Sequence, residues 1–212
     1  MVEATSRAPR DPRRLARAVS ATLVAYAATE AGVAVLSAVE IGRLMNGAAE
    51  LSIGGRLAYF ATMTAWQAAY LLTAALGLLW FYRANQNAAA LASDKSISPV
   101  WSIVWFFIPI ANFAMPFKAM SETWRISLSP ANWKEAPLPE RVSFWWGLLL
   151  LSSLLNVMEG YPGQTGQDPG PLLLSMELKL VSSFMAIGAA LLLRRIVREI
   201  SDAQASAGSD RD

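Results

Sequence analysis

The chain has 212 residues, of which 54% are hydrophobic and only 16% are charged, and its formal net charge is +2. Soluble domains carry roughly a quarter charged residues, so this composition indicates a membrane protein and gives no sign of a nucleic-acid partner. The sequence has no Cys, which excludes disulfides and thiolate metal sites, and no His, the most common general base and metal ligand. We therefore expect no metal, no cofactor and no catalytic residue.

The first half of the chain contains two candidate membrane spans. Residues 1–16 are polar and basic, and we expect a disordered cytoplasmic tail. An Ala-rich run over residues 17–39 follows; it is too long for the apolar core of a signal peptide and predicts the first span. Residues 57–82 form the clearest span, because an aromatic cluster closed by Arg83 is typical of a helix end at the headgroup level.

The segment 98–128 decides the topology of everything after it. It is apolar enough to enter a bilayer, yet Pro109 and Asn112 interrupt it and Pro116 follows. Pro109 cannot donate a backbone hydrogen bond and clashes with the preceding turn. Asn112 can bond to the carbonyls that such a break leaves exposed in lipid. The sequence favours a re-entrant or interfacial helical hairpin, and a single kinked span is the alternative.

Two further apolar runs, 143–158 and 172–193, predict the last two spans. The segment between them is turn-rich and has no Lys or Arg. Residues 201–212 are small and polar, and we expect a second disordered tail. The predicted fold is all-α: a membrane helical bundle over residues 17–200, with four transmembrane helices and the central hairpin.

Lys and Arg collect on the cytoplasmic side of membrane proteins, so their distribution tests the two paths of the central segment. If the segment crosses the membrane, about seven of these residues lie inside and nine outside. If it re-enters, about fourteen lie inside and only Arg43 and Arg56 lie outside. The count favours the hairpin, with both termini cytoplasmic.

Five short motifs occur in order between Trp80 and Arg125. They are WFYRANQNA at 80–88, SPVW at 98–101, WFFIPIAN at 105–112, MPFK at 115–118 and ETWR at 122–125. This ordered string resembles a bacterial membrane family known as domain of unknown function 4328. The resemblance implies a multi-pass membrane protein and supplies no activity, cofactor or catalytic residue.

One group of candidate residues lies in and beside the central segment. Its polar members could contact lipid phosphates or a protein partner at the cytoplasmic face. The group comprises Arg83, Asn85, Asn87, Pro99, Trp101, Trp105, Pro109, Asn112, Pro116, Lys118, Glu122, Trp124 and Arg125. The alternative is an ordinary interfacial anchor, in which Lys118, Glu122 and Arg125 form weak salt bridges with one another.

A second group of candidates falls inside the predicted spans: Glu30, Gln67, Glu177 and Lys179. An ionisable side chain within the membrane is a functional candidate by default. The alternative for Glu30 is a protonated carboxyl group that hydrogen-bonds to Gln67 or to a Ser or Thr and so holds helices together. Lys179 can instead extend its ammonium toward the headgroups.

Two functions remain open from the sequence. The first is a non-enzymatic module of the bacterial cytoplasmic (inner) membrane that contacts an anionic lipid or a protein partner at the cytoplasmic face. The second is a small channel or transporter that uses the broken central segment and Glu30, because broken helices and buried ionisable groups mark such pathways.

Overall fold

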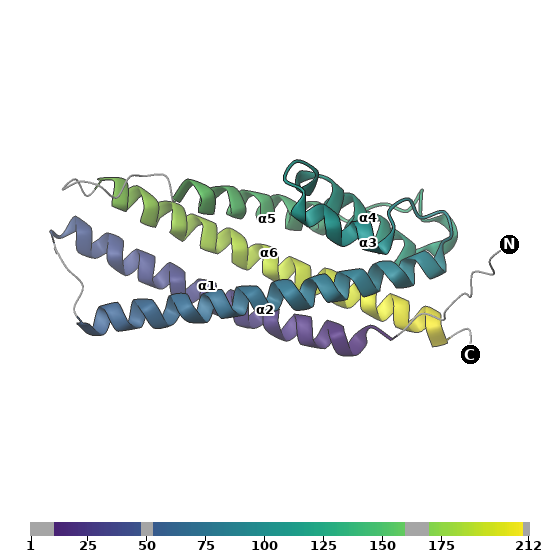
Figure 1. Cartoon of the computed structure of the whole chain (residues 1–212), viewed down its shortest axis with the longest axis horizontal. Coiled ribbons are helices and arrows are strands. Elements are labelled where there is room, and N and C mark those ends of the chain that lie inside the picture. Colours follow the sequence, from purple (N-terminus) through teal and green to yellow (C-terminus); the bar gives the residue numbers. More distant parts are fainter. Residues whose placement is uncertain (1–10, 48–52, 160–169, 210–212) are drawn as a thin grey trace. The chain divides into compact units, whose positions relative to one another are not determined.

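The described part of the chain is almost entirely helical. The computed structural model describes residues 11–47, 53–159 and 170–209, and these ranges contain no strand (Figure 1). Four helices within them are long and apolar enough to cross a membrane. They are α1 (Arg13–Met45), α2 (Ile53–Leu91), α5 (Glu140–Glu159) and α6 (Gly170–Ser209). The predicted all-α bundle with four candidate spans is confirmed.

The long helices extend beyond the apolar runs from which the spans were predicted. α1 begins at Arg13, inside the stretch expected to be a tail, and α2 continues past its aromatic cluster to Leu91. The added residues are largely Arg, Ala, Gln and Leu, which favour helix wherever nothing interrupts it. Residues 1–10 of the predicted N-terminal tail lie outside the described residues.

The C-terminal end differs most from the sequence prediction. α6 continues to Ser209, although a disordered tail was expected from residue 201. The reason is burial, because Ser201 and Gln204 are each only 1% exposed. This last part of α6 therefore packs against the rest of the protein. Residues 210–212 lie outside the described residues.

The central segment folds back on itself. It begins with α3 (Pro99–Val104) and the 3₁₀ turn η1 (Trp105–Phe107), and returns through η2 (Ala111–Phe113) and α4 (Met115–Leu128). The axis turns by 114° at the break between the two arms. Figure 1 shows the two arms lying beside each other as a helical hairpin.

Local sequence explains where the hairpin starts and turns. Ser98 caps α3, since its hydroxyl accepts a hydrogen bond from the backbone N–H of Trp101 at 3.4 Å. Ile108 is extended, with φ −101° and ψ 110°, as expected for the residue before Pro109. The turn is then closed by the backbone of Asn112, whose N–H donates to the Ile108 carbonyl at 2.8 Å. The side chain of Asn112 makes no hydrogen bond within the described residues, contrary to its expected role in the turn.

The chain divides into two compact units, and each takes one part of every long helix. Unit 1 comprises Met1–Ala21, Ala74–Ser143 and Leu192–Asp212, and it includes the hairpin. Unit 2 comprises Thr22–Thr73 and Phe144–Leu191.

Unit 1 has a core of large buried side chains. Trp80, Ile126, Ile196 and Ile200 are each less than 2% exposed and come from α2, α4 and α6. Phe81 of α2 also meets Phe106 of the hairpin edge to face, with ring centroids 6.0 Å apart. The hairpin is thus packed against α2 and α6 along its inner side.

In unit 2, a glycine allows α5 and α6 to approach each other closely. A Cβ added at Gly188 of α6 would lie 3.1 Å from Leu148 Cδ1 of α5. Such close approach is typical of helix contacts in membranes, where small residues replace the hydrophobic effect as the basis of packing. Large apolar side chains point outward instead: Leu71, Leu154 and Phe184 are between 55% and 64% exposed. These outward faces suit a surrounding lipid.

The bend can be measured directly in the intact protein. Spin labels at Val100→Cys and Leu128→Cys would lie on the two arms of the hairpin, at positions that are 58% and 40% exposed. A continuous helix over these 28 residues would separate their backbones by about 42 Å, at 1.5 Å per residue. We expect pulsed electron paramagnetic resonance to give a distance between the two labels that is well below this value. A distance near 42 Å would show that the segment is one straight span.

Candidate functional site

Gln204 on α6 lies at the centre of a buried group of hydrogen bonds in unit 1. Its Nε2 donates to the Ala84 carbonyl of α2 at 2.9 Å and to Ser127 Oγ of α4 at 2.8 Å. Its Oε1 accepts from Asn87 Nδ2 of α2 at 3.0 Å. One amide therefore joins α6 to both α2 and the returning arm of the hairpin.

Two further buried bonds reinforce these contacts. Thr123 Oγ1 of α4 donates to Asn85 Oδ1 of α2 at 3.0 Å, and Trp80 Nε1 of α2 donates to Ser201 Oγ of α6 at 2.9 Å. Buried polar groups stabilise a fold only when they have hydrogen-bond partners, and each of these groups has one. We call the set the polar latch; it consists of Trp80, Asn85, Asn87, Thr123, Ser127, Ser201 and Gln204.

Glu122 of α4 anchors the start of the hairpin. Its carboxylate accepts a hydrogen bond from the Ser96 hydroxyl and another from the Ile97 backbone N–H at 3.3 Å. It also faces the Lys95 ammonium, with 3.8 Å between Nζ and Oε2. The side chains of Lys95 and Glu122 are 2% and 7% exposed, and burial lowers the pKa of Lys95 although the carboxylate opposes that shift.

Glu199 of α6 forms a second, more exposed contact in the same unit. Its carboxylate binds both Nε and Nη2 of Arg141 at 2.9 Å and accepts a hydrogen bond from Trp124 Nε1 at 3.3 Å. The Arg141 guanidinium also lies 5.9 Å from the Trp124 ring centroid. The start of α5 is thereby held against α4 and α6.

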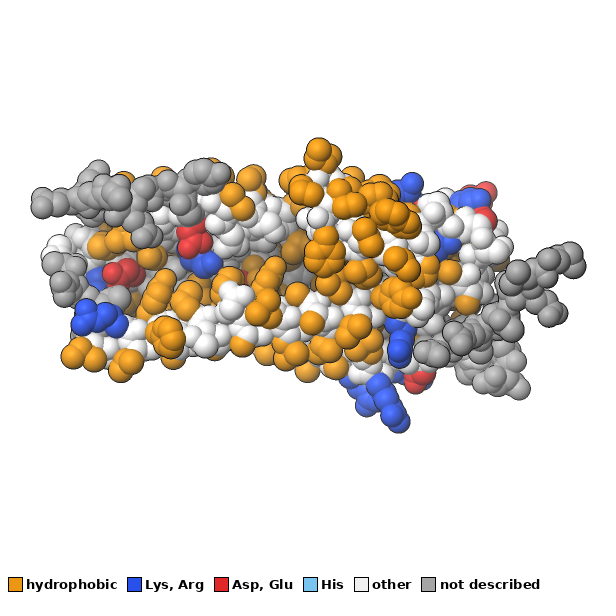
Figure 2. All heavy atoms as spheres, in the orientation of Figure 1, with side chains coloured by type: hydrophobic (Ala, Val, Ile, Leu, Met, Phe, Trp, Pro, Cys, Tyr) orange, Lys and Arg blue, Asp and Glu red, His pale blue; other side chains and the backbone are white. Residues whose placement is uncertain are grey.

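The outer end of the hairpin is apolar and exposed. Phe107, Ile110 and Phe113 are 71%, 88% and 65% exposed, and Ile108 between them is 36% exposed. We call these four residues the apolar tip. Figure 2 shows orange hydrophobic atoms gathered over the hairpin at the upper edge of the view. A rigidly held element thus presents large apolar side chains outward.

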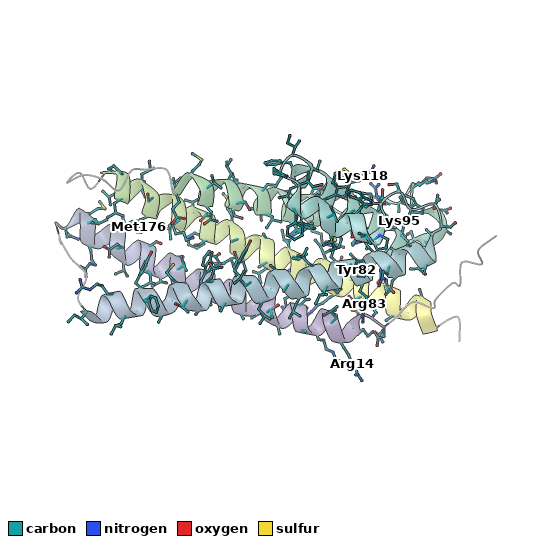
Figure 3. The ribbon with its side chains drawn as sticks, in the orientation of Figure 1. Arg14, Tyr82, Arg83, Lys95, Lys118 and Met176 are labelled. Atoms are coloured by element: carbon teal, nitrogen blue, oxygen red, sulfur yellow. The ribbon has the colours of Figure 1, made fainter. Side chains whose placement is uncertain are left out.

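The basic candidates do not gather at one point. Figure 3 shows Lys118 on the hairpin and Arg83 on α2, apart from each other. Asn85 and Asn87, expected at a surface, are buried in the polar latch. The alternative, in which Lys118 and Arg125 form salt bridges with Glu122, is not seen among the described residues, because Glu122 pairs with Lys95.

The remaining residues of the central motif shape the hairpin. Pro99 and Pro116 stand in the first turns of α3 and α4, where the missing N–H costs nothing. Trp101 and Trp105 lie against each other, with ring centroids 4.7 Å apart. Pro109 is exposed at the bend. These residues account for the geometry of the motif rather than for any chemistry.

A second polar group lies in unit 2, around Glu30 of α1. The Glu30 side chain is buried, at 2% exposed. Its Oε1 accepts hydrogen bonds from Tyr26 Oη at 2.6 Å and from Trp66 Nε1 of α2 at 2.7 Å. Gln67, the partner expected from the sequence, is exposed instead, since it lies one residue further around the helix.

Lys179 of α6 joins this group from the other side of Trp66. Its Nζ lies 4.7 Å from the Trp66 ring centroid, and it donates to Asn156 Oδ1 of α5 at 2.9 Å. Glu159 Oε2 of α5 is 3.4 Å from the same Nζ. Glu177, the other candidate on α6, is exposed. The structure therefore keeps Glu30 and Lys179 as buried candidates and removes Gln67 and Glu177.

Several residues of both groups were not expected from the sequence. Ser201 and Gln204 lie in the stretch taken for a tail, yet the spacing Ile196, Ile200, Gln204 continues one helix face. That spacing was a usable signal. Tyr26 precedes Glu30 by four residues, the spacing of helix neighbours, and was a usable signal too. Within the described residues, no group of three or more His, Cys, Asp or Glu could hold a metal ion.

The latch can be tested at Gln204. Gln204→Leu keeps a similar volume but removes the donor to the Ala84 carbonyl and to Ser127 Oγ, together with the oxygen that accepts from Asn87. A buried polar group left unsatisfied costs about 1–3 kcal/mol, so we expect a clearly lower melting temperature in detergent. Gln86→Leu, at an exposed position of α2, is the control and should change the melting temperature little. Equal melting temperatures for the two variants would contradict the latch.

The Lys95–Glu122 pair gives a second test. Lys95→Met leaves a buried carboxylate without its cation, which typically costs about 3–5 kcal/mol. Adding Glu122→Gln removes that charge and keeps an acceptor for the Ile97 N–H, so the double variant should recover most of the loss in melting temperature. Lys134→Met, which removes an exposed pair with Asp94, is the control and should cost under about 1 kcal/mol. A double variant no more stable than Lys95→Met would contradict the charge argument.

Comparison with known proteins agrees with this architecture. The family described as domain of unknown function (DUF4328) matches residues 43–202, a range that contains the whole hairpin and ends two residues before Gln204. No curated protein matches the chain, and no solved structure does. The family carries no assigned activity, and no catalytic family is indicated. With most of its length covered and four candidate spans, the chain belongs to the family of domain of unknown function 4328 and is a multi-pass membrane protein.

Proposed function

We propose that the protein is a non-enzymatic module of the bacterial cytoplasmic (inner) membrane that binds lipid through its hairpin. The observation that carries this proposal is the apolar tip, 65–88% exposed at Phe107, Ile110 and Phe113. Moving such a side chain from water into an apolar phase gains about 1.5–3 kcal/mol. Because the base of the hairpin is held by the polar latch, inserting the tip into lipid requires no refolding of unit 1.

The distribution of charge supports a cytoplasmic position for the hairpin. If the hairpin re-enters, about fourteen Lys and Arg lie on the cytoplasmic side and two, Arg43 and Arg56, lie outside. The 114° bend between the arms agrees with a segment that enters and returns on one side. In this topology both termini are cytoplasmic.

Anionic headgroups are the partner that suits the base of the tip. Lys118 is exposed in the first turn of α4, a few residues beyond Phe113. Trp101, at 48% exposed, also lies on the outer surface of the hairpin, and Trp side chains favour the depth of the headgroups. A basic residue beside an inserted apolar segment attracts anionic lipid by about 1 kcal/mol. Binding of the purified protein's hairpin to anionic lipid alone would account for this face without a protein partner.

A small channel or transporter is the second candidate, and the burial of Glu30 at 2% exposed is the observation that favours it. Such a protein would give proton or ion flux in sealed liposomes, whereas a lipid-binding module should give none above empty liposomes. We expect none. Flux that disappears in Glu30→Gln would overturn the proposal in favour of the channel or transporter.

Cysteine labelling tests the insertion of the tip, because the chain has no native Cys. Phe107→Cys and Ile110→Cys should resist a membrane-impermeant maleimide applied from either side of intact membranes, and should react after denaturation. Ala131→Cys, exposed in the loop after α4, is the control and should react from the cytoplasmic side only. Labelling of the tip as fast as Ala131→Cys would contradict insertion, and labelling of Ala131→Cys from outside would contradict the topology.

A further inference from the structure

The polar group of unit 2 receives side chains from all four long helices. Glu30 and Tyr26 come from α1, Trp66 from α2, Lys179 from α6 and Asn156 from α5. Within these contacts Trp66 is the central member. Its ring N–H donates to the Glu30 carboxylate while its face lies 4.7 Å from the Lys179 ammonium.

This arrangement places two ionisable groups inside candidate spans. Glu30 lies 17 residues from the start of α1 and 15 from its end, which is about 22–26 Å along the helix from either. It is 2% exposed, and Lys179 is 9% exposed. Charges at such positions are costly and are retained where they bind or move something.

The bonds to Glu30 permit the carboxyl group to exist with or without a proton. Both donors, Tyr26 Oη and Trp66 Nε1, reach the same oxygen, Oε1. In the carboxylate, Oε1 accepts both bonds; in the acid, Oε1 is the carbonyl oxygen and still accepts both, while Oε2 carries the proton. Protonation therefore breaks neither bond.

Trp66 contacts both Glu30 and Lys179, and so provides an electrostatic link between them. The edge of an aromatic ring is positive and its face negative, so a carboxylate at the Trp66 N–H and a cation over the Trp66 face are both favoured. Loss of the negative charge leaves Lys179 with Asn156 Oδ1 at 2.9 Å and Glu159 Oε2 at 3.4 Å as its polar partners. The Lys179 ammonium therefore has the Trp66 face within reach on one side and Glu159 on the other.

We propose that Glu30 is a proton-binding site whose occupancy is sensed by Lys179 across the ring of Trp66. The ligand is a proton drawn from water: the carboxylate gains it on Oε2 to form the neutral acid and returns it to water. Other titratable side chains in this group are Tyr26 and Tyr70, whose rings lie 6.1 Å apart, and Glu159. The proposal concerns unit 2 and does not depend on the insertion of the hairpin in lipid.

Infrared difference spectroscopy of the protein in lipid tests the site, because a protonated carboxyl group has its own C=O band. Spectra recorded between about pH 5 and pH 9 should contain a carboxyl band that changes with pH and is lost in Glu30→Gln. Tyr26→Phe removes one of the two bonds to Oε1, so it should move the same band to higher frequency. Lys179→Met should change the frequency of the same band, because the Lys179 ammonium lies over the Trp66 ring that donates to Oε1. A band left unchanged by Lys179→Met would overturn the role of Lys179.

Glu177→Gln is the matched control, since Glu177 is an exposed carboxylate of the same helix as Lys179. The carboxyl band of the Glu177→Gln protein should be the same as that of the wild type. A spectrum without any pH-dependent carboxyl band, or a band that persists in Glu30→Gln, would overturn the proposal. If Glu30→Gln does not fold, Tyr26→Phe decides, because an unshifted band cannot belong to Glu30. Cysteine labelling tests the insertion of the hairpin and infrared spectroscopy tests the Glu30 site. Each proposal can therefore fail while the other holds.

Discussion

The structure of unit 1 depends on a single buried amide. Gln204 makes three hydrogen bonds to groups on α2 and α4 while it is only 1% exposed. Leaving such groups unpaired inside a protein costs more than pairing them gains, so the amide fixes the register of three helices at once. It also explains why α6 does not end where its apolar run ends, since the helix must continue to Gln204 to make these bonds.

Much of the fold could be predicted, because hydrophobic runs and helix-breaking residues act locally. The four candidate spans follow from their apolar length, and the break at Pro109 follows from its missing N–H. The end of α6 could not be found in this way. Polar composition suggested disorder after residue 200, whereas burial of Ser201 and Gln204 depends on partners that are more than 70 residues away in the chain.

The candidate residues were predicted less well than the fold, for a geometric reason. Glu30 was recognised from its depth in an apolar run, and it is indeed buried. Its partner was expected to be Gln67, but depth alone does not fix rotation about the helix axis. A shift of one residue turns a side chain by about 100°, enough to bring Trp66 to Glu30 and leave Gln67 exposed. Similarly, the charges of α4 were paired with one another although Glu122 pairs with Lys95.

The family motif divides its residues between two tasks. Its polar members, such as Asn85, Asn87 and Thr123, lie inside unit 1 and hold the hairpin, while its apolar members Phe107 and Ile110 lie outside. A soluble protein would place these groups the other way round. In a bilayer the arrangement is consistent, because lipid accepts apolar side chains and the interior must satisfy the polar ones. The motif is therefore best understood as the means of building a firmly held hairpin whose outer surface is apolar.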